Sequence, residues 1–180
     1  MKFKDIAGHW AEEEMIEMAK AGVINGRSET EFAPEETMTR AEYAALIRRA
    51  IGLNLSSYQG GYGDVDGNAW YANEIQAIVN AGIMIGDAEG TFRPEETITR
   101  QEAAKVIVTA YLFKMNIQDI ANTNISFYDS HEIAGWAAEY VQKAVASGLM
   151  NGMGDGLFAP AQNMTRAQGA TIIARLLNKE

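Results

Sequence analysis

Three arginines recur in one local pattern that is suited to binding an anion. Each follows a threonine, and the pairs are spaced by 60 and 66 residues: Thr39-Arg40, Thr99-Arg100 and Thr165-Arg166. A Glu or Gln stands three residues after each threonine, which is the capping-box pattern that starts a helix and places the arginine in its first turn. A cation there opposes the helix dipole, which favours anions by about 0.3–1 kcal/mol, so a further interaction must explain the arginines.

Two interpretations of these arginines remain open. Each guanidinium could bridge to a carboxylate of a neighbouring repeat. Alternatively, free backbone N–H groups at the helix start and the guanidinium fork could together bind a carboxylate or a phosphate. The chain carries 15 Lys and Arg against 24 Asp and Glu, a net charge of −9. An anion site in such a chain would select its ligand by geometry rather than by bulk charge.

Three tryptophans share the same spacing and are candidate sugar-binding residues. Trp10, Trp70 and Trp136 each precede the arginine of their repeat by 30 residues. A sugar-facing indole is one interpretation. The other is a partly buried anchor whose indole N–H finds a hydrogen-bond partner.

Glycines and aspartates at matching positions complete the candidate ligand-binding set. Gly26, Gly86 and Gly152 each lie 16 residues after the tryptophan of their repeat. Glycine there would allow a ligand to approach the backbone closely, or would simply form a turn. An aromatic-x-Asp pattern opens each repeat, and its aspartates are included as candidates: Asp5, Asp64 and Asp129.

The sequence around these motifs predicts two helices in each of three repeats. Apolar residues at helical spacing follow each tryptophan, and a glycine twelve residues after it ends the helix. A Gly-rich loop leads to the second helix, which begins at the Thr-Arg pair. We assign the repeats to residues 1–53, 62–112 and 125–178 of one structural domain, with linkers at 54–61 and 113–124. Because two short helices cannot bury their apolar faces alone, we expect an all-α, pseudo-threefold assembly around a shared core.

Composition excludes several classes of function. A net charge of −9 disfavours nucleic acid as a partner. Cysteine is absent and histidine occurs only as His9 and His131, so we expect no metal and no cofactor. An EF-hand-like start at Asp64 fails at its sixth and twelfth positions, Ala69 and Ile75. No apolar run approaches the roughly 20 residues of a membrane span, and the N-terminus lacks the apolar core of a signal peptide.

Catalytic residues are not predicted. The sequence contains no Gly-x-Ser-x-Gly elbow, and neither histidine lies in a recurring motif. The acidic residues show no distinctive pairing of the kind that glycoside hydrolysis uses. Three similar clefts also suit multivalent binding better than a single asymmetric active site.

The three units resemble the S-layer homology domain, whose signature is Ile-Thr-Arg-Ala-Glu. The signature reads Met-Thr-Arg-Ala-Glu at 38–42, Ile-Thr-Arg-Gln-Glu at 98–102 and Met-Thr-Arg-Ala-Gln at 164–168. The resemblance covers nearly the whole chain and implies a pseudo-trimeric spindle of helices around a shared three-helix core. Gln168 replaces the final Glu, and Ile85 replaces the Asn found at Asn25 and Asn151, so equal use of all three grooves is not expected.

The same resemblance implies non-covalent anchoring of a surface protein to the secondary cell wall polysaccharide of a Gram-positive-type envelope. In many members the ligand is pyruvylated N-acetylmannosamine, held in inter-repeat grooves with the signature arginine on the pyruvyl carboxylate. We therefore expect a non-enzymatic part of a larger S-layer or surface protein, located at the cell surface, with the signal peptide outside this sequence. The alternative is a protein–protein assembly module of a surface layer without direct sugar recognition.

Overall fold

The computed structural model describes residues 3–121 and 123–179. Within these ranges the chain forms six α-helices and one short 3₁₀-helix: α1 (Glu12–Lys20), α2 (Arg40–Ala50), α3 (Ala72–Asn80), α4 (Arg100–Met115), η1 (Ser130–Glu132), α5 (Ala138–Ala146) and α6 (Arg166–Leu177). The prediction of an all-α fold built from two helices per repeat is confirmed. Helix α4 runs to Met115, so the start of the linker expected at 113–124 is helical.

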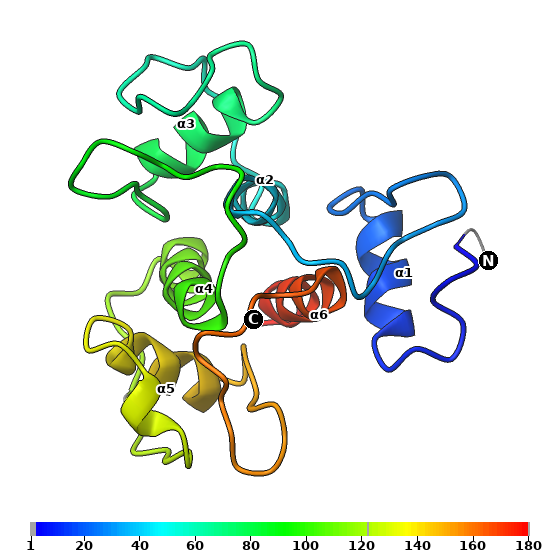
Figure 1. Cartoon of the computed structure of the whole chain (residues 1–180), viewed down its shortest axis with the longest axis vertical. Coiled ribbons are helices and arrows are strands. Elements are labelled where there is room, and N and C mark those ends of the chain that lie inside the picture. Colours follow the sequence, from blue (N-terminus) through cyan, green and yellow to red (C-terminus); the bar gives the residue numbers. More distant parts are fainter. Residues whose placement is uncertain (1–2, 122, 180) are drawn as a thin grey trace.

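The six helices are arranged as an inner set of three and an outer set of three. Helices α2, α4 and α6 contact one another around a common axis, and each carries one outer helix (Figure 1). The outer helix of each repeat does not pack on its own partner. Helix α3 packs on α2, α5 packs on α4, and α1 packs on α6, which joins the first repeat to the third. Every lobe of the spindle is therefore shared between two repeats.

Local sequence signals start and end these helices as expected. The side chains of Thr39, Thr99 and Thr165 each accept the N–H of the residue three positions on, and all three capping boxes are complete. At the C-terminal ends of the outer helices α1, α3 and α5, Gly22, Gly82 and Gly148 adopt φ values of 70°, 68° and 69°. In α1, Gly22 N–H donates to Ala19 and Val23 N–H to Met18. This is the paired bond of a Schellman motif, which needs a left-handed residue that glycine adopts without strain.

The residues before the three inner helices close a ring of backbone hydrogen bonds around the axis. Met38 N–H donates to Met164, Met164 N–H to Ile98, and Ile98 N–H to Met38, at N···O distances of 2.9, 2.9 and 3.0 Å. All three side chains are buried. A Cβ at position 169 would lie 2.4 Å from Met38 Sδ. Because position 169 is a glycine, the Met38 side chain of another repeat can pack against it in the core.

The aspartate of each aromatic-x-Asp pattern holds the loop that precedes an inner helix. Its carboxylate accepts the N–H groups of two successive residues at 2.7–2.9 Å: Asp5 from Phe32 and Ala33, Asp64 from Phe92 and Arg93, and Asp129 from Phe158 and Ala159. The second residue of each pair precedes a proline and has a φ between 57° and 60°. A left-handed conformation costs a non-glycine residue about 1–2 kcal/mol, which the charge-assisted bonds offset.

Because the lobes are shared, removal of the third repeat should destroy the fold of the first two. A fragment of residues 1–124 lacks α5 and α6, so α1 and the inner faces of α2 and α4 are left uncovered. Exposure of about 400 Å² of apolar surface costs about 10 kcal/mol, comparable to the whole stability of a typical domain. We expect this fragment to be molten or aggregated by circular dichroism melts. A cooperative transition in the fragment would contradict the shared-core architecture.

Asp129→Asn should lower the free energy of unfolding by about 1.5–3 kcal/mol at neutral pH. Burial raises the pKa of the Asp129 carboxyl, but the N–H groups of Phe158 and Ala159 outweigh burial and leave the pKa below its ordinary value. A depressed folded-state pKa contributes stability above the unfolded pKa of about 3.9, and this contribution is lost as pH falls through the folded value. Urea denaturation should therefore separate wild type from variant at pH 7 and bring them together at low pH. The exposed Glu29→Gln serves as control, and a pH-independent difference would contradict the carboxylate's role.

Candidate functional site

Three grooves lie between the lobes, and each is lined by residues from all three repeats. Groove A contains the loop at 24–27, Trp70 and Arg166, and encloses about 170 Å³. Groove B contains the loop at 82–87, Trp136 and Arg40, and encloses about 290 Å³. Groove C contains the loop at 150–153, Trp10 and Arg100, and encloses about 480 Å³. Each signature arginine thus meets a tryptophan and a glycine of two other repeats.

The signature arginines are buried, with only 3–5% of each residue exposed. Nε of each donates to a phenylalanine carbonyl of another repeat at 2.8–2.9 Å: Arg40 to Phe92, Arg100 to Phe158 and Arg166 to Phe32. Nη2 donates to a second carbonyl of that repeat, at Ile85, Asn151 and Asn25 respectively. Each guanidinium also lies 4.8–5.3 Å from the ring centroid of the same phenylalanine. The arginines therefore join repeats through backbone carbonyls.

The backbone N–H groups at the helix starts are not free, so that half of the anion-site hypothesis is wrong. Arg40 N–H donates to Glu96 and Ala41 N–H to Pro94, at 2.8 and 3.0 Å. The equivalent bonds at α4 and α6 run from Arg100 to Gln162, Gln101 to Pro160, Arg166 to Glu36 and Ala167 to Pro34. Neighbouring carbonyls occupy the donors that a ligand would need. An anion in a groove could therefore bind only the edge of the guanidinium that faces that groove.

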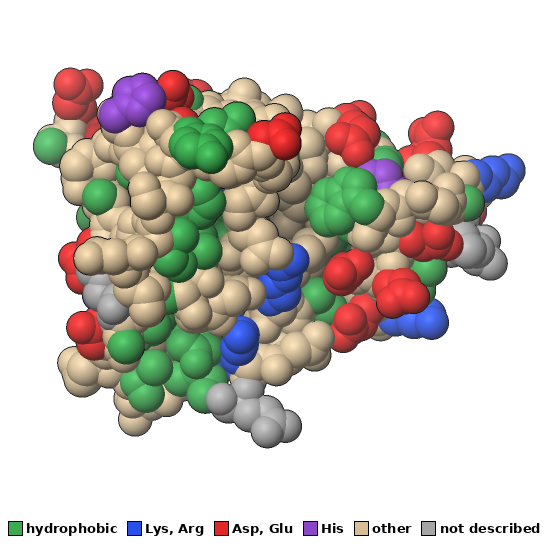
Figure 2. Space-filling view, turned by 90° about the horizontal axis from the view of Figure 1, so that it is seen from below, with side chains coloured by type: hydrophobic (Ala, Val, Ile, Leu, Met, Phe, Trp, Pro, Cys, Tyr) green, Lys and Arg blue, Asp and Glu red, His purple; other side chains and the backbone are tan. Residues whose placement is uncertain are grey.

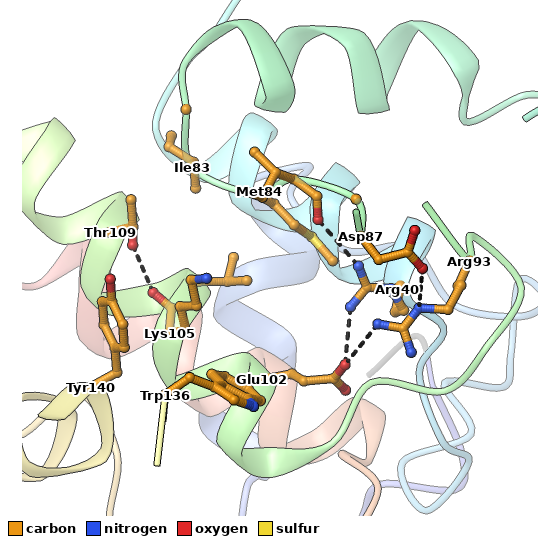
Figure 3. Close-up of a pocket in the computed structure, with 14 residues that line it drawn as sticks. Arg40, Ile83, Met84, Asp87, Arg93, Glu102, Lys105, Thr109, Trp136 and Tyr140 are labelled. Atoms are coloured by element: carbon orange, nitrogen blue, oxygen red, sulfur yellow. Dashed lines mark hydrogen bonds and ion pairs between the residues drawn. The ribbon is translucent and has the colours of Figure 1, made fainter. Parts of the chain in front are cut away.

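Charges around the guanidinium differ among the grooves. In groove B the carboxylate of Glu102 lies between Arg40 and Arg93, at 3.2 and 3.4 Å (Figure 3). In groove A the equivalent Glu42 binds Arg27 at 2.5 Å. Groove C has Gln168 at this position. Burial lowers the pKa of all three signature arginines, and lowers that of Arg100 to about 10.

The three tryptophans stand at the groove rims with more than half of each residue exposed: 62% for Trp10, 58% for Trp70 and 51% for Trp136. In groove B, Lys105 Nζ lies 5.8 Å from the Trp136 ring centroid, and Trp136 and Glu102 both line the groove (Figure 3). An indole exposed to this extent has a face available to a ligand, whereas a core anchor would not. The tryptophans are therefore not core residues, and each is placed where a ligand in the groove could contact it.

The glycines of the candidate set line the grooves, and each also lies against an internal aromatic ring. A Cβ at Gly26 would lie 2.3 Å from Phe3, one at Gly86 would lie 2.3 Å from Tyr62, and one at Gly152 would lie 2.9 Å from Phe127. These rings belong to the aromatic-x-Asp pattern and pack on Phe32, Phe92 and Phe158. A backbone carbonyl oxygen lies equally close, at 2.3–2.7 Å from the same Cβ positions, so glycine is required here because a ring and a carbonyl both press on the backbone.

Asp5, Asp64 and Asp129 do not line grooves A, B or C. Their carboxylates bind loop N–H groups, which gives them a structural contact in place of the expected ligand role. Asp129 acts on a groove indirectly, since the Phe158 whose N–H it binds offers its carbonyl to Arg100.

Sequence reasoning missed one stripe of groove residues on each inner helix. Groove C is lined by Gln168, Thr171, Ile172 and Arg175, at i, i+3, i+4 and i+7. The corresponding residues are Glu42, Ala45, Leu46 and Arg49 in groove A, and Glu102, Lys105, Val106 and Thr109 in groove B. Residues at this spacing share one helix face, so the stripe could have been read from the capping-box residue onward.

Among the helices of the described residues, none is long and apolar enough to cross a membrane. Residues 3–121 and 123–179 also contain no group of three or more His, Asp or Glu side chains placed to hold a metal ion. On the face shown in Figure 2, acidic side chains are spread widely and basic side chains are fewer.

Comparison with known proteins places these features in a family. The family model of the S-layer homology domain matches residues 2–44, 61–104 and 126–170. An amylopullulanase of Thermoanaerobacterium thermosulfurigenes is 37% identical over 98% of this chain, which corresponds to 10% of the enzyme. The surface-layer 125 kDa protein of Lysinibacillus sphaericus is 32% identical over 97% of this chain and 14% of its own length. S-layer protein EA1 of Bacillus anthracis is 29% identical over 96% of this chain and 20% of its own length.

The chain thus spans between a tenth and a fifth of these relatives, some of which have the names of enzymes and others of surface-layer proteins. The three capping boxes and the three aromatic-x-Asp patterns of this chain lie within the matched segments. This chain belongs to the S-layer homology domain family, of which it contains three consecutive copies.

Proposed function

We propose that this domain anchors a larger surface protein to the cell wall by binding secondary cell wall polysaccharide in its inter-repeat grooves. The observation that carries the proposal is the threefold pairing of a rim tryptophan with a buried arginine in a groove that all three repeats build. An exposed indole can stack on a sugar ring, and a guanidinium edge can bind an acidic substituent on that sugar. Neither role requires a nucleophile or a general base.

The proposed ligand is a pyruvylated N-acetylmannosamine unit, which combines a sugar face with a small carboxylate. A buried guanidinium that already holds two carbonyls is fixed in orientation, so little entropy is lost when a carboxylate binds its remaining edge. Several grooves on one polymer would also raise avidity without new contacts. The enzyme names among the relatives are attributed to the rest of those longer chains, and this domain would be non-catalytic and located at the cell surface.

Removal of the pyruvyl group should weaken binding roughly ten- to a hundred-fold. This follows from the loss of a charge-assisted hydrogen bond that contributes about 1.5–3 kcal/mol. Calorimetry should compare purified pyruvylated wall polysaccharide with the same polymer after mild acid treatment. Sedimentation with cell walls before and after extraction of the polysaccharide is the companion assay. Equal binding to stripped walls would favour the alternative, a protein assembly module without sugar recognition.

Combined replacement of Trp10, Trp70 and Trp136 by alanine should abolish wall binding and leave the fold intact. Because more than half of each tryptophan is exposed, we expect the melting temperature to change by only a few degrees. Replacement of the exposed Tyr128 by alanine is a control, since this aromatic residue does not line grooves A, B or C. Wall binding retained by the triple variant would rule out the indoles as sugar-binding surfaces.

A further inference from the structure

We infer that a cavity beside α1 is the docking site of a non-helical segment of polypeptide, and that its occupant is the stretch of chain that leads into Phe3. This cavity, called the α1 pocket, encloses about 760 Å³. Its lining includes the apolar Phe3, Ile16, Ala19 and Ile24 and the exposed Lys20 and Glu29. The inference concerns the junction between this domain and the chain ahead of it, so it goes beyond the proposed function of the grooves.

In the lobe of α2 and α3, the linker that enters the second repeat lies on the outer helix. Tyr58 N–H donates to the Asn73 side chain at 2.9 Å, and Gln59 N–H donates to the Gln76 side chain at 3.0 Å. Asn73 and Gln76 are three residues apart and share one face of α3. The Tyr58 side chain is half-buried, and its hydroxyl donates to the Tyr62 carbonyl at 3.1 Å. The linker therefore covers this face of α3.

The lobe of α4 and α5 repeats this arrangement with the linker that enters the third repeat. The Gln142 side chain accepts Ile125 N–H at 2.7 Å and donates to the Ile125 carbonyl at 2.5 Å. Asp119, from the same linker, binds Lys143 of α5 at 2.5 Å. Gln142 and Gln76 each lie six residues after the tryptophan of their repeat. In both lobes a glutamine at this position thus binds the backbone of the entering segment.

The α1 pocket lies on the corresponding face of the remaining lobe. Ile16 is six residues after Trp10, is half-buried and lines the pocket. Among the described residues, those that line the pocket all come from the first repeat. The linker residues that bind α3 and α5 lie two to four residues ahead of Tyr62 and Phe127, whose counterpart is Phe3. The residues ahead of Phe3 are therefore the counterpart of the two linkers.

The lining of the pocket favours the chain's own segment over a separate partner. Ile16 cannot hydrogen-bond a backbone as Gln76 and Gln142 do, so binding on this face must rely on apolar side chains of the segment that pack on Ile16 and Ala19. Because Phe3 lines the pocket, the chain itself holds the segment at the pocket's edge. A short tether gives an effective concentration on the order of millimolar, at which weak apolar contacts suffice.

Cysteine labelling tests the inference, because the chain contains no cysteine of its own. Ala19→Cys places a thiol in the α1 pocket, and Glu17→Cys, at an exposed position of α1 outside the pocket lining, is the control. The rate of alkylation by iodoacetamide is compared between the natural chain and a chain truncated ahead of Phe3. We expect truncation to speed alkylation of Ala19→Cys at least tenfold and to leave Glu17→Cys unchanged. Truncation should also lower the melting temperature by about 2–4 °C.

A graft of residues 54–61 ahead of Phe3, combined with Ile16→Gln, rebuilds the linker contact of the second repeat and should slow alkylation of Ala19→Cys again. A Gly-Ser stretch of the same length should not. Equal alkylation in the natural and truncated chains, or no protection by the graft, would overturn the inference.

Protection that increases with protein concentration would also overturn the inference, in favour of a second copy of the domain as the occupant. Sedimentation of the same proteins with cell walls reports separately on the proposed function, because Ile16 and Ala19 do not line grooves A, B or C. The two failures are thus distinguishable.

Discussion

Each signature arginine buries a guanidinium between repeats, and its hydrogen bonds to the carbonyls of another repeat determine how the domain is put together. A buried charge is expensive unless its donors are satisfied, and these donors are satisfied only when the neighbouring loop is in place. That loop is in turn ordered by an aspartate that binds the N–H groups beside the accepting carbonyl. The stability of each repeat therefore depends on the neighbouring repeat, which supplies the accepting carbonyls and the aspartate that orders their loop.

The same arrangement explains why the grooves are equivalent in backbone and unequal in chemistry. The bonds that hold the arginine are made with backbone carbonyls, which are insensitive to side-chain identity, so all three grooves keep one geometry. The residues on the facing helix stripe are not needed for those bonds and differ among repeats, as Gln168, Glu42 and Glu102 do. Sequence variation thus falls on charge and volume while the framework is preserved.

Sequence reasoning predicted the features that depend on nearby residues. The capping boxes, the helix-ending glycines and the three-repeat all-α organisation follow from local patterns, and they are present in the structure. Features that depend on distant residues were not predicted. The occupied N–H groups of the inner helices, the ring packed on Gly26 and the role of Asp5 all require knowing which repeat faces which. The extension of α4 to Met115 was missed because the linker composition obscured the helix.

The lobe formed by α1 and α6 joins the two ends of the described chain, and this has a consequence for the order of folding. The hydrogen bond from Arg166 to Phe32 spans 134 residues, whereas those of Arg40 and Arg100 span 52 and 58. Closing the longer loop costs about 0.8 kcal/mol more by chain entropy. Within this domain, α1 is synthesised before the other helices, and α6, on which it packs, is synthesised after them. Met15 and Met18, which are buried in the folded domain, are exposed in the interval. We therefore expect closure of the ring by α6 to be a late step of folding, with the apolar face of α1 exposed until it occurs.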